Sequence, residues 1–263
     1  MNFIFFFANI ISINIMSDYK VIKKLGEGYE GDVLLIHKGK EKLIKKIARI
    51  NCNQSIPDTK YSIWREIDFS KFAKNNPEYF MQLVEYGIDY ECTYKKDVPK
   101  FLIDWNRKEQ IKEWKEDQKT LCCYYLIYKP VLDGTLTDLY EMYNKAFPSK
   151  FNRKTNMFPI PFYKDNFILL FQQLFILYEL SNNGWNHRNA HPSNWMYKKT
   201  TKPIKMGKYT FKFPYKIILC DYGSVIHSSH ELDDREKKDK YNIKADTYND
   251  IISNLGDNIA DPV

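Results

Sequence analysis

The chain has 263 residues, of which 44% are hydrophobic and 28% charged, so it can bury a core and is not disordered as a whole. Its net charge of +7 is too small to indicate nucleic-acid binding by itself, and no run of about 18 apolar residues predicts a membrane-spanning helix. The five cysteines form no C-x-x-C motif, which argues against a zinc cluster or a disulfide framework and favours a reducing compartment such as the cytoplasm.

The first fifteen residues are mostly hydrophobic and contain no Lys or Arg. A secretory signal normally begins with basic residues and ends at a small-residue cleavage site, and both are missing. Met16 then opens an ordinary globular sequence. We therefore interpret residues 1–15 as an upstream start or a dispensable leader, with a signal or anchor and a packed strand as the alternatives.

The next part of the chain is typical of a sheet with one helix. Strands are expected at residues 19–25, 33–36, 43–47, 81–87 and 122–128. A helix is expected at residues 61–73, where apolar and charged side chains interleave. The stretch 104–119 has five acids and five bases, which predicts a solvated helix inserted between strands. A plain surface insertion is favoured there over a docking element.

The second half begins as a helical sequence. Residues 165–183 are apolar nearly all round and end at Gly184, which predicts a buried helix. Residues 198–216 contain seven lysines and no acid, and aromatic residues alternate with polar ones from Tyr209 to Tyr215. That alternation predicts a hairpin with its aromatic side chains on the core and its lysines in water. The alternative, that the aromatic and basic faces grip nucleic acid, is the less favoured one.

A glycine-rich segment lies between the first two expected strands. It reads Gly26-Glu27-Gly28-Tyr29-Glu30-Gly31-Asp32-Val33 and fits the pattern G-x-G-x-x-G-x-V. Glycines let a backbone approach phosphate groups closely. Strands flank the segment on both sides, whereas a dinucleotide fingerprint opens a helix, so a Rossmann site is disfavoured.

A lysine and a glutamate follow at positions that suit an ion pair. Lys45 lies on the third expected strand and Glu66 on the helix after it. A lysine that points into a core needs a carboxylate partner, which Glu66 could supply. The alternative is that both are surface charges.

Two further motifs come late in the chain. The first is His187-Arg188-Asn189-Ala190-His191-Pro192-Ser193-Asn194, directly after the apolar helix. The second is an apolar run that ends in Cys220-Asp221-Tyr222-Gly223. A carboxylate at the end of a strand can bind a magnesium ion that bridges phosphates.

In this order the four motifs resemble those of the protein kinase family: the glycine loop, the strand lysine with its helix glutamate, H-R-D-x-x-x-x-N and D-F-G. The resemblance runs from about residue 19 to about residue 251. A compact kinase of this kind is similar to those of large DNA viruses. It implies an α+β, two-lobed protein-kinase-like fold. The first lobe, 16–130, would hold an antiparallel sheet, one helix and a charged insertion at 95–119. The second, 131–263, would be reduced and mainly helical, with a basic hairpin inserted at 198–216.

The resemblance also implies a role for each matching residue. The glycine loop, with Gly26, Glu27, Gly28, Gly31 and Val33, would cover ATP. Lys45 would bind the α- and β-phosphates and pair with Glu66. The magnesium ligands would be Asn194 and Asp221. In the segment that resembles the hinge between lobes, Lys129 and Val131 would offer backbone groups to adenine, and Thr135 would face the ribose. Arg188, Asn189 and His191 would complete the catalytic set.

Two departures from the family bear on activity. Asn189 stands where the family has its catalytic aspartate, and an amide cannot accept a proton. His191 stands where protein kinases usually have a lysine that touches the γ-phosphate, and a neutral histidine stabilises less charge. In addition, only 42 residues follow Asp221, so we expect either that the region that usually binds peptide is reduced or that the chain is truncated.

The expected function is ATP- and magnesium-dependent transfer of phosphate to Ser or Thr of proteins, weakened by Asn189. One alternative is a catalytically silent pseudokinase that acts as a nucleotide-binding scaffold. Another is a small-molecule phosphotransferase, suggested by His191. The expected partners are ATP and a substrate or regulated protein, in a host cytoplasm if the protein is viral, with nucleic acid unlikely and no membrane. Cys220, next to Asp221, is expected near the ATP site, so that ATP would slow its alkylation.

Overall fold

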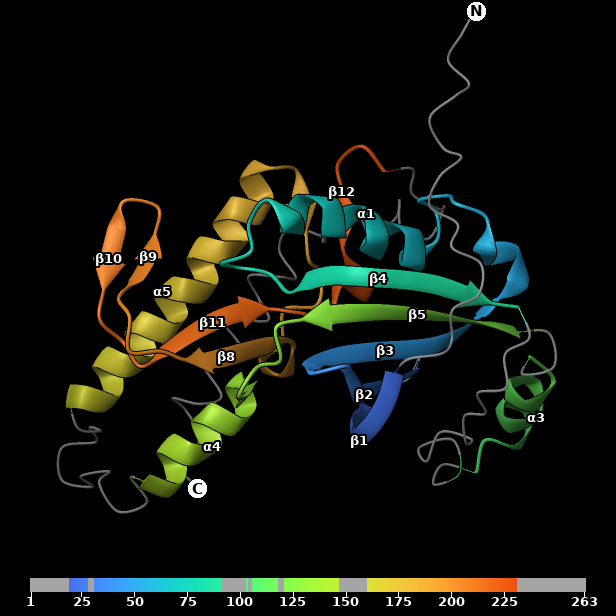
Figure 1. Ribbon diagram of the computed structural model, residues 1–263, viewed down its shortest axis with the longest axis horizontal. Coiled ribbons are helices and arrows are strands. Elements are labelled where there is room, and N and C mark those ends of the chain that lie inside the picture. Colours follow the sequence, from blue (N-terminus) through green and yellow to red (C-terminus); the bar gives the residue numbers. More distant parts are fainter. Residues whose placement is uncertain are drawn as a thin grey trace, which may run out of the picture. The chain divides into compact units, whose positions relative to one another are not determined.

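The computed structural model describes residues 19–27, 31–90, 103, 106–117, 121–146 and 160–230 (Figure 1). The chain divides into two compact units. Within the described residues, the first unit comprises the chain up to Asp58 together with Gln82–Val131, and the second comprises Thr59–Met81 and the chain from Leu132 onward. The division after Val131 lies one residue from the predicted boundary. The helix at residues 62–74, however, belongs to the second unit rather than to the sheet that was expected to hold it.

The first unit is built on a five-stranded antiparallel sheet with the strand order β1-β2-β3-β5-β4 (Figure 1). The five strands are β1 (Tyr19–Glu27), β2 (Gly31–Lys38), β3 (Glu41–Asn51), β4 (Gln82–Asp89) and β5 (Leu121–Lys129). All five strands expected from the sequence are confirmed. A tight turn joins β2 to β3, and Gly39 takes a positive φ of 60° there, which glycine adopts without steric cost.

Apolar residues gather on one face of this sheet because side chains alternate along each strand. Ile36, Leu43 and Ile127 are buried together there, with Leu34 and Tyr125 packed against them. The opposite face buries Ala48 and Leu126, among other residues. The sheet therefore buries side chains on both faces.

A disulfide bond joins Cys52 to Cys122, which the cysteine pattern did not predict. Cys52 begins the short 3-10 helix η1 (Cys52–Ser55) directly after β3, and Cys122 lies in β5, the neighbouring strand. Strand pairing brings the two residues together although 70 positions separate them in the sequence. The cysteine count therefore gives no support to a reducing compartment.

The predicted charged insertion contains the helix α3 (Lys108–Asp117), whose described side chains are almost all exposed. This confirms a solvated helix. The expected leader at residues 1–15 lies outside the described residues. Of the helices in the described ranges, none is both long enough and apolar enough to cross a membrane.

Within the residues that the structure describes, the second unit combines three helices with several short strands. Its helices are α1 (Ser62–Lys74), α4 (Leu136–Ala146) and α5 (Ile160–Asn182), with short 3-10 helices η3 (Pro192–Asn194) and η4 (Tyr222–Ser224). Its strands are β6 (Gly134–Thr135), β7 (Trp185–Asn186), β8 (Trp195–Lys199), β9 (Ile204–Met206), β10 (Tyr209–Phe211), β11 (Tyr215–Leu219) and β12 (Ile226–His227). They form a three-stranded sheet, β11-β8-β6, and the two pairs β10-β9 and β12-β7.

This content makes the predicted fold class wrong. We expected an α+β, two-lobed protein-kinase-like fold with a mainly helical second lobe, but the described chain is 40% strand and 34% helix. The strands after residue 132 are two to five residues long, and such short segments leave almost no periodic signal in a sequence. A hairpin at residues 198–216 was expected, whereas β6, β7 and β12 lie in a region that had been expected to be mainly helical.

The long helix α5 differs from its prediction in one respect. Leu169, Ile176 and Leu180 are buried, as expected for a core helix. Phe167 and Tyr178 remain 68% and 55% exposed, so one side of the helix carries apolar residues in solvent. Apolar residues around the whole helix therefore did not mean burial of the whole helix.

The basic segment forms the predicted hairpin. β9 and β10 pair with each other and lie beside α5 (Figure 1). The Phe211 ring centroid is 5.9 Å from that of Phe171 on α5, and Phe213 is buried. Tyr209 departs from the prediction, since its side chain is 47% exposed.

Candidate active site

The glycine segment joins β1 to β2, and the structure describes its two ends. Gly26 lies in β1 and Gly31 begins β2, whereas Gly28 lies outside the described residues. A Cβ atom added to Gly31 would lie 2.6 Å from Cβ of Ala48, its partner on β3. Gly31 is thus required by the close packing of two strands, which is a structural reason for glycine in addition to the expected approach to phosphates.

The strand register shows which lysine shares a face with the glycine segment. Val33 of β2 lies directly opposite Lys46 of β3, and Leu34 lies opposite Lys45. Directly opposite residues of an antiparallel pair project from the same face of the sheet. Lys46 therefore lies on the face of Val33, whereas Lys45, the residue chosen from the sequence, lies on the other face.

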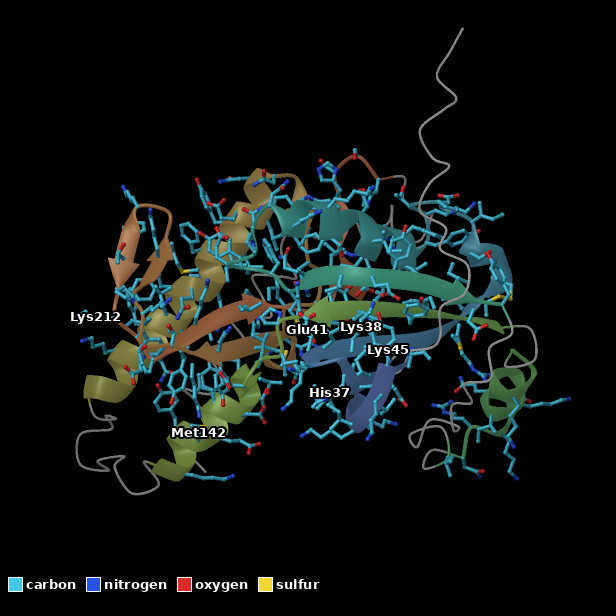
Figure 2. The ribbon with its side chains drawn as sticks, viewed as in Figure 1. His37, Lys38, Glu41, Lys45, Met142 and Lys212 are labelled. Carbon is cyan, nitrogen blue, oxygen red and sulfur yellow. A yellow bond between two sulfur atoms is a disulfide. The ribbon has the colours of Figure 1, made fainter. Side chains whose placement is uncertain are left out.

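Lys45 has its own surroundings on that other face. Its Nζ lies 4.9 Å from the centroid of the Tyr125 ring. Partial burial lowers the pKa of Lys45, and the nearby carboxylates of Glu85 and Asp89 oppose that shift. Figure 2 labels Lys45 together with Lys38, whose Nζ forms an ion pair with Glu85 at 3.2 Å. Lys45 therefore packs beside Tyr125 on this face of the sheet.

Glu66 lies on α1 in the second unit and is 1% exposed. Its backbone carbonyl accepts a hydrogen bond from Ser70 Oγ at 2.9 Å. A buried carboxylate is costly unless polar groups surround it, so this position is unusual for a structural helix residue. The pairing of Glu66 with a lysine of the sheet stays a prediction.

The expected hinge segment lies at the end of β5 and just beyond it. The Lys129 side chain is exposed and its Nζ lies 3.9 Å from a carboxylate oxygen of Glu41. Lys129 is the last residue of β5 to pair with β4, opposite Gln82. The adenine-binding role of the Lys129 and Val131 backbone groups stays a prediction.

Thr135 has a local structural role instead of facing open solvent. Its backbone N–H and its hydroxyl donate to Asp138 Oδ2 at 2.7 and 2.8 Å, and its Oγ1 accepts the Asp138 N–H at 3.1 Å. This reciprocal set caps the first turn of α4. The Thr135 hydroxyl is therefore occupied by the helix cap, which competes with the expected contact to ribose.

The loop at residues 187–194 is hydrogen-bonded to the end of β11. Cys220 N donates to the Asn194 carbonyl at 2.9 Å, and Cys220 Sγ donates to the same oxygen at 3.0 Å. Within the loop, Asn194 Nδ2 donates to the Asn189 carbonyl at 2.8 Å. The backbone at Asn194 is thereby joined to Cys220, the residue directly before Asp221.

His187 reinforces this join from below the surface. It is fully buried, and its Nε2 lies 3.1 Å from the Cys220 carbonyl oxygen. A carbonyl can only accept, so Nε2 carries the hydrogen. Burial lowers the pKa of His187 to about 4, and the charge of Asp221 opposes the shift without reversing it. His187 is therefore neutral near pH 7.

Two residues of the predicted site hold a left-handed backbone conformation. Arg188 has a φ of 62° and Asp221 a φ of 57°, values that side-chain-bearing residues rarely adopt. Arg188 Nε donates to the Ser224 carbonyl at 2.7 Å, which fastens the loop to the segment after Asp221. Strained backbone of this kind gathers at functional sites, because elsewhere it is removed at a gain of about 1 kcal/mol or more.

Tyr222 anchors the same segment to the rest of the second unit. Its hydroxyl donates to the Leu219 carbonyl at 2.6 Å and accepts the Met81 N–H at 2.7 Å. Its ring centroid lies 4.4 Å from that of Phe69 on α1. Burial raises the pKa of Tyr222 well above its ordinary value, and the charges of Glu66 and Asp221 add to this. Tyr222, the middle residue of D-Y-G, thus joins the Leu219 carbonyl to the Met81 N–H through its buried hydroxyl.

The remaining site residues differ in exposure. Asp221 is exposed, Asn189 and His191 are half-buried, and Asn194 is buried. The ranges that the structure describes contain no group of three or more His, Cys, Asp or Glu side chains that could hold a metal ion. Asn194 and Asp221 as magnesium ligands stay a prediction; two oxygen ligands would suit magnesium, since it usually takes one or two protein ligands and completes its shell with water and phosphate.

Sequence reasoning missed Lys46, although a signal for it was present. The tight turn pairs Lys38 with Glu41, and counting back from there places residue 46 opposite Val33.

No protein-family model matches the chain, and no curated protein matches it either. The resemblance to protein kinases therefore stands on the four motifs alone.

Proposed function

We propose that the protein binds ATP with magnesium and transfers the γ-phosphate to serine or threonine hydroxyls of a partner protein. The observation that carries the proposal is the hydrogen-bonded join between Asn194 and Cys220, which links the loop to the residue directly before Asp221. A buried neutral histidine and two strained backbone positions support this arrangement. Strained backbone that is held in place by buried hydrogen bonds is more typical of a ligand-binding or catalytic site than of a plain turn.

Each residue then has a chemical task. Asn194 and Asp221 hold magnesium, which neutralises phosphate charge. Lys46 takes the phosphate-binding role that the sequence had given to Lys45, because it shares a face with Val33. Adenine is met by backbone groups of Lys129 and Val131. His191 donates a hydrogen bond to a phosphate oxygen.

Asn189 sets the expected rate. Its amide can orient a substrate hydroxyl but cannot take its proton. General-base catalysis contributes about 10²- to 10⁴-fold, while positioning and charge stabilisation carry most of phosphoryl transfer. We therefore propose a slow enzyme, in which the released proton passes to water or to phosphate oxygen.

The test is transfer of labelled γ-phosphate to a generic basic protein by chain starting at Met16, with Asp221→Ala and Asn189→Asp in parallel. The expected result is weak transfer that disappears in Asp221→Ala and rises in Asn189→Asp. Transfer that persists in Asp221→Ala would contradict the proposal, because the magnesium ligand would be dispensable.

A second function is favoured by one observation, the amide at position 189. A protein that binds ATP without transferring phosphate would act as a nucleotide-binding scaffold for a regulated partner. Silence in the natural chain together with activity in Asn189→Asp would select this function. Silence in both, with an ATP-dependent rise in melting temperature, would select it as well.

A further inference from the structure

The segment at residues 198–216 presents positive charge that the described part of the protein does not neutralise. Six of its seven lysines are exposed and Lys216 is half-buried. We call this set the lysine surface: Lys198, Lys199, Lys202, Lys205, Lys208, Lys212 and Lys216. No carboxylate among the described residues forms an ion pair with any of them. The Asp133 carboxylate accepts a hydrogen bond from the backbone N–H of Lys199, not from its ammonium group.

The hairpin itself directs these lysines outward. Ile204 and Met206 of β9 are buried, and Lys205 between them is exposed, opposite Thr210 of β10. Because side chains alternate, one hairpin face covers α5 and the other carries charge. Figure 2 labels Lys212, whose side chain projects away from the protein.

Two lysines of the surface face each other directly. Lys198 of β8 lies opposite Lys216 of β11 in the strand register. Like charges in directly opposite positions destabilise an antiparallel pair. Burial lowers the pKa of Lys216, the neighbouring Lys198 lowers it further, and Glu78 opposes them. An anion bound near this pair would relieve the repulsion.

One exposed aromatic ring, Tyr209, lies beside Lys208, although the strand register puts Tyr209 on the hairpin face of Met206 and not on that of Lys205. Tyr209 in β10 is 47% exposed, and the Lys208 Nζ lies 5.4 Å from its ring centroid. The Tyr209 ring also lies 5.4 Å from that of Phe171 on α5, the helix whose Phe167 and Tyr178 remain exposed. Positive charge beside exposed flat rings is the combination that single-stranded nucleic acids use, since phosphates meet the lysines and bases stack on the rings.

We propose that the lysine surface, together with Tyr209, binds single-stranded nucleic acid. The lysines contact backbone phosphates and Tyr209 stacks on a base. An anionic membrane fits less well, because Ile204 and Met206 are buried and Tyr209 is the only large apolar side chain exposed in the described hairpin. An acidic peptide would use the charges but would leave the stacking faces without a matching partner.

The test compares two triple charge reversals by fluorescence anisotropy with a labelled oligothymidylate of about 20 nucleotides. One variant is Lys205→Glu/Lys208→Glu/Lys212→Glu on the hairpin. Its matched control, Lys108→Glu/Lys112→Glu/Lys115→Glu on α3, changes the net charge equally and also alters exposed residues only. The hairpin variant is expected to lose roughly thirtyfold or more in affinity, and the control less than about threefold. Equal losses in both variants would overturn the proposal.

Two further measurements separate stacking from charge. Tyr209→Leu is expected to weaken binding about tenfold and Tyr209→Phe to leave it unchanged, because only the flat ring is needed. Equal affinities for the two variants would remove the stacking contact and with it the proposal. Polyglutamate and anionic phospholipid vesicles, at the same concentration of negative charge, are expected to bind much more weakly. Binding of either as tight as that of the oligonucleotide would overturn nucleic acid as the partner.

Discussion

Strand β3 and the loop at residues 187–194 both carry candidate site residues, but they hold them by different means. In β3 the backbone hydrogen bonds to β2 and β5 fix the direction of each side chain, so Lys45 and Lys46 lie on opposite faces of the sheet. In the loop, side chains such as His187 and Asn194 bind backbone groups and hold the chain in place. A site on the strand therefore depends on register, and a site on the loop depends on individual side chains.

The covalent bond at the end of β3 gives the largest expected effect. Cys52→Ser/Cys122→Ser removes a link that closes a loop of 70 residues, which should lower the free energy of unfolding by about 4 kcal/mol. Urea unfolding of the oxidised protein measures it. Cys220→Ser is the control, because Cys220 remains a thiol and serine keeps a donor for the Asn194 carbonyl. An unchanged midpoint in the double variant would show that the ladders alone maintain β3.

Acid should weaken the loop, through His187. Its pKa of about 4 in the folded protein lies below the ordinary value of 6.5, so protonation favours the unfolded chain. The stability that neutral His187 provides is complete above pH 6.5 and falls by about 3 kcal/mol as the pH drops to 4. Urea unfolding between pH 7 and 4, without divalent cations, measures this loss. His187→Gln should flatten the curve, and an equally steep curve for that variant would contradict the assignment to His187.

The two neighbouring lysines test the register directly. Lys46→Ala should weaken ATP binding by about 2 kcal/mol, or roughly thirtyfold, because a charge-assisted contact to phosphate is lost. Lys45→Ala should leave ATP affinity nearly unchanged, since Lys45 lies on the other face beside Tyr125. Calorimetric titration with magnesium and ATP gives both values. The reverse ranking would mean that the original choice of Lys45 was the right one.

Tyr222→Phe gives the smallest of these effects. It removes a hydroxyl that joins the Leu219 carbonyl to the Met81 N–H, and both groups stay buried. A loss of about 1.5 kcal/mol in the free energy of unfolding is expected. Tyr209→Phe removes a hydroxyl from an exposed side chain and should change stability by less than about 0.5 kcal/mol. If the two variants unfold at the same urea concentration, the hydrogen bonds of the Tyr222 hydroxyl contribute nothing measurable to stability.

The sheet of the first unit could be predicted from the sequence because its strands are long and rich in apolar residues. The turn after Lys38 was also visible, and it contained enough information to place Lys46 opposite Val33. The helix cap at Thr135 had a signature as well, since an aspartate follows three residues later. Both facts were readable and were outweighed by the resemblance to kinase motifs.

Other features had no local signal. The Cys52–Cys122 bond depends on which strands become neighbours, and spacing alone cannot show that. The pair β7-β12 joins two strands of two residues each, too short for any periodicity. Exposure of Phe167 and Tyr178 on α5 depends on what packs against that helix, which an apolar sequence cannot reveal.

Arg188 and Asp221 show how stability and activity can pull a sequence in opposite directions. Both residues occupy backbone conformations that glycine would adopt without cost, at a saving of roughly 1 kcal/mol each. A population of variants selected only for heat resistance should therefore accumulate glycine at position 221 but keep Arg188, because Arg188 Nε donates to the Ser224 carbonyl. A population selected for phosphate transfer should keep Asp221 despite that gain, so directed evolution under the two regimes would reveal which pressure shaped this loop.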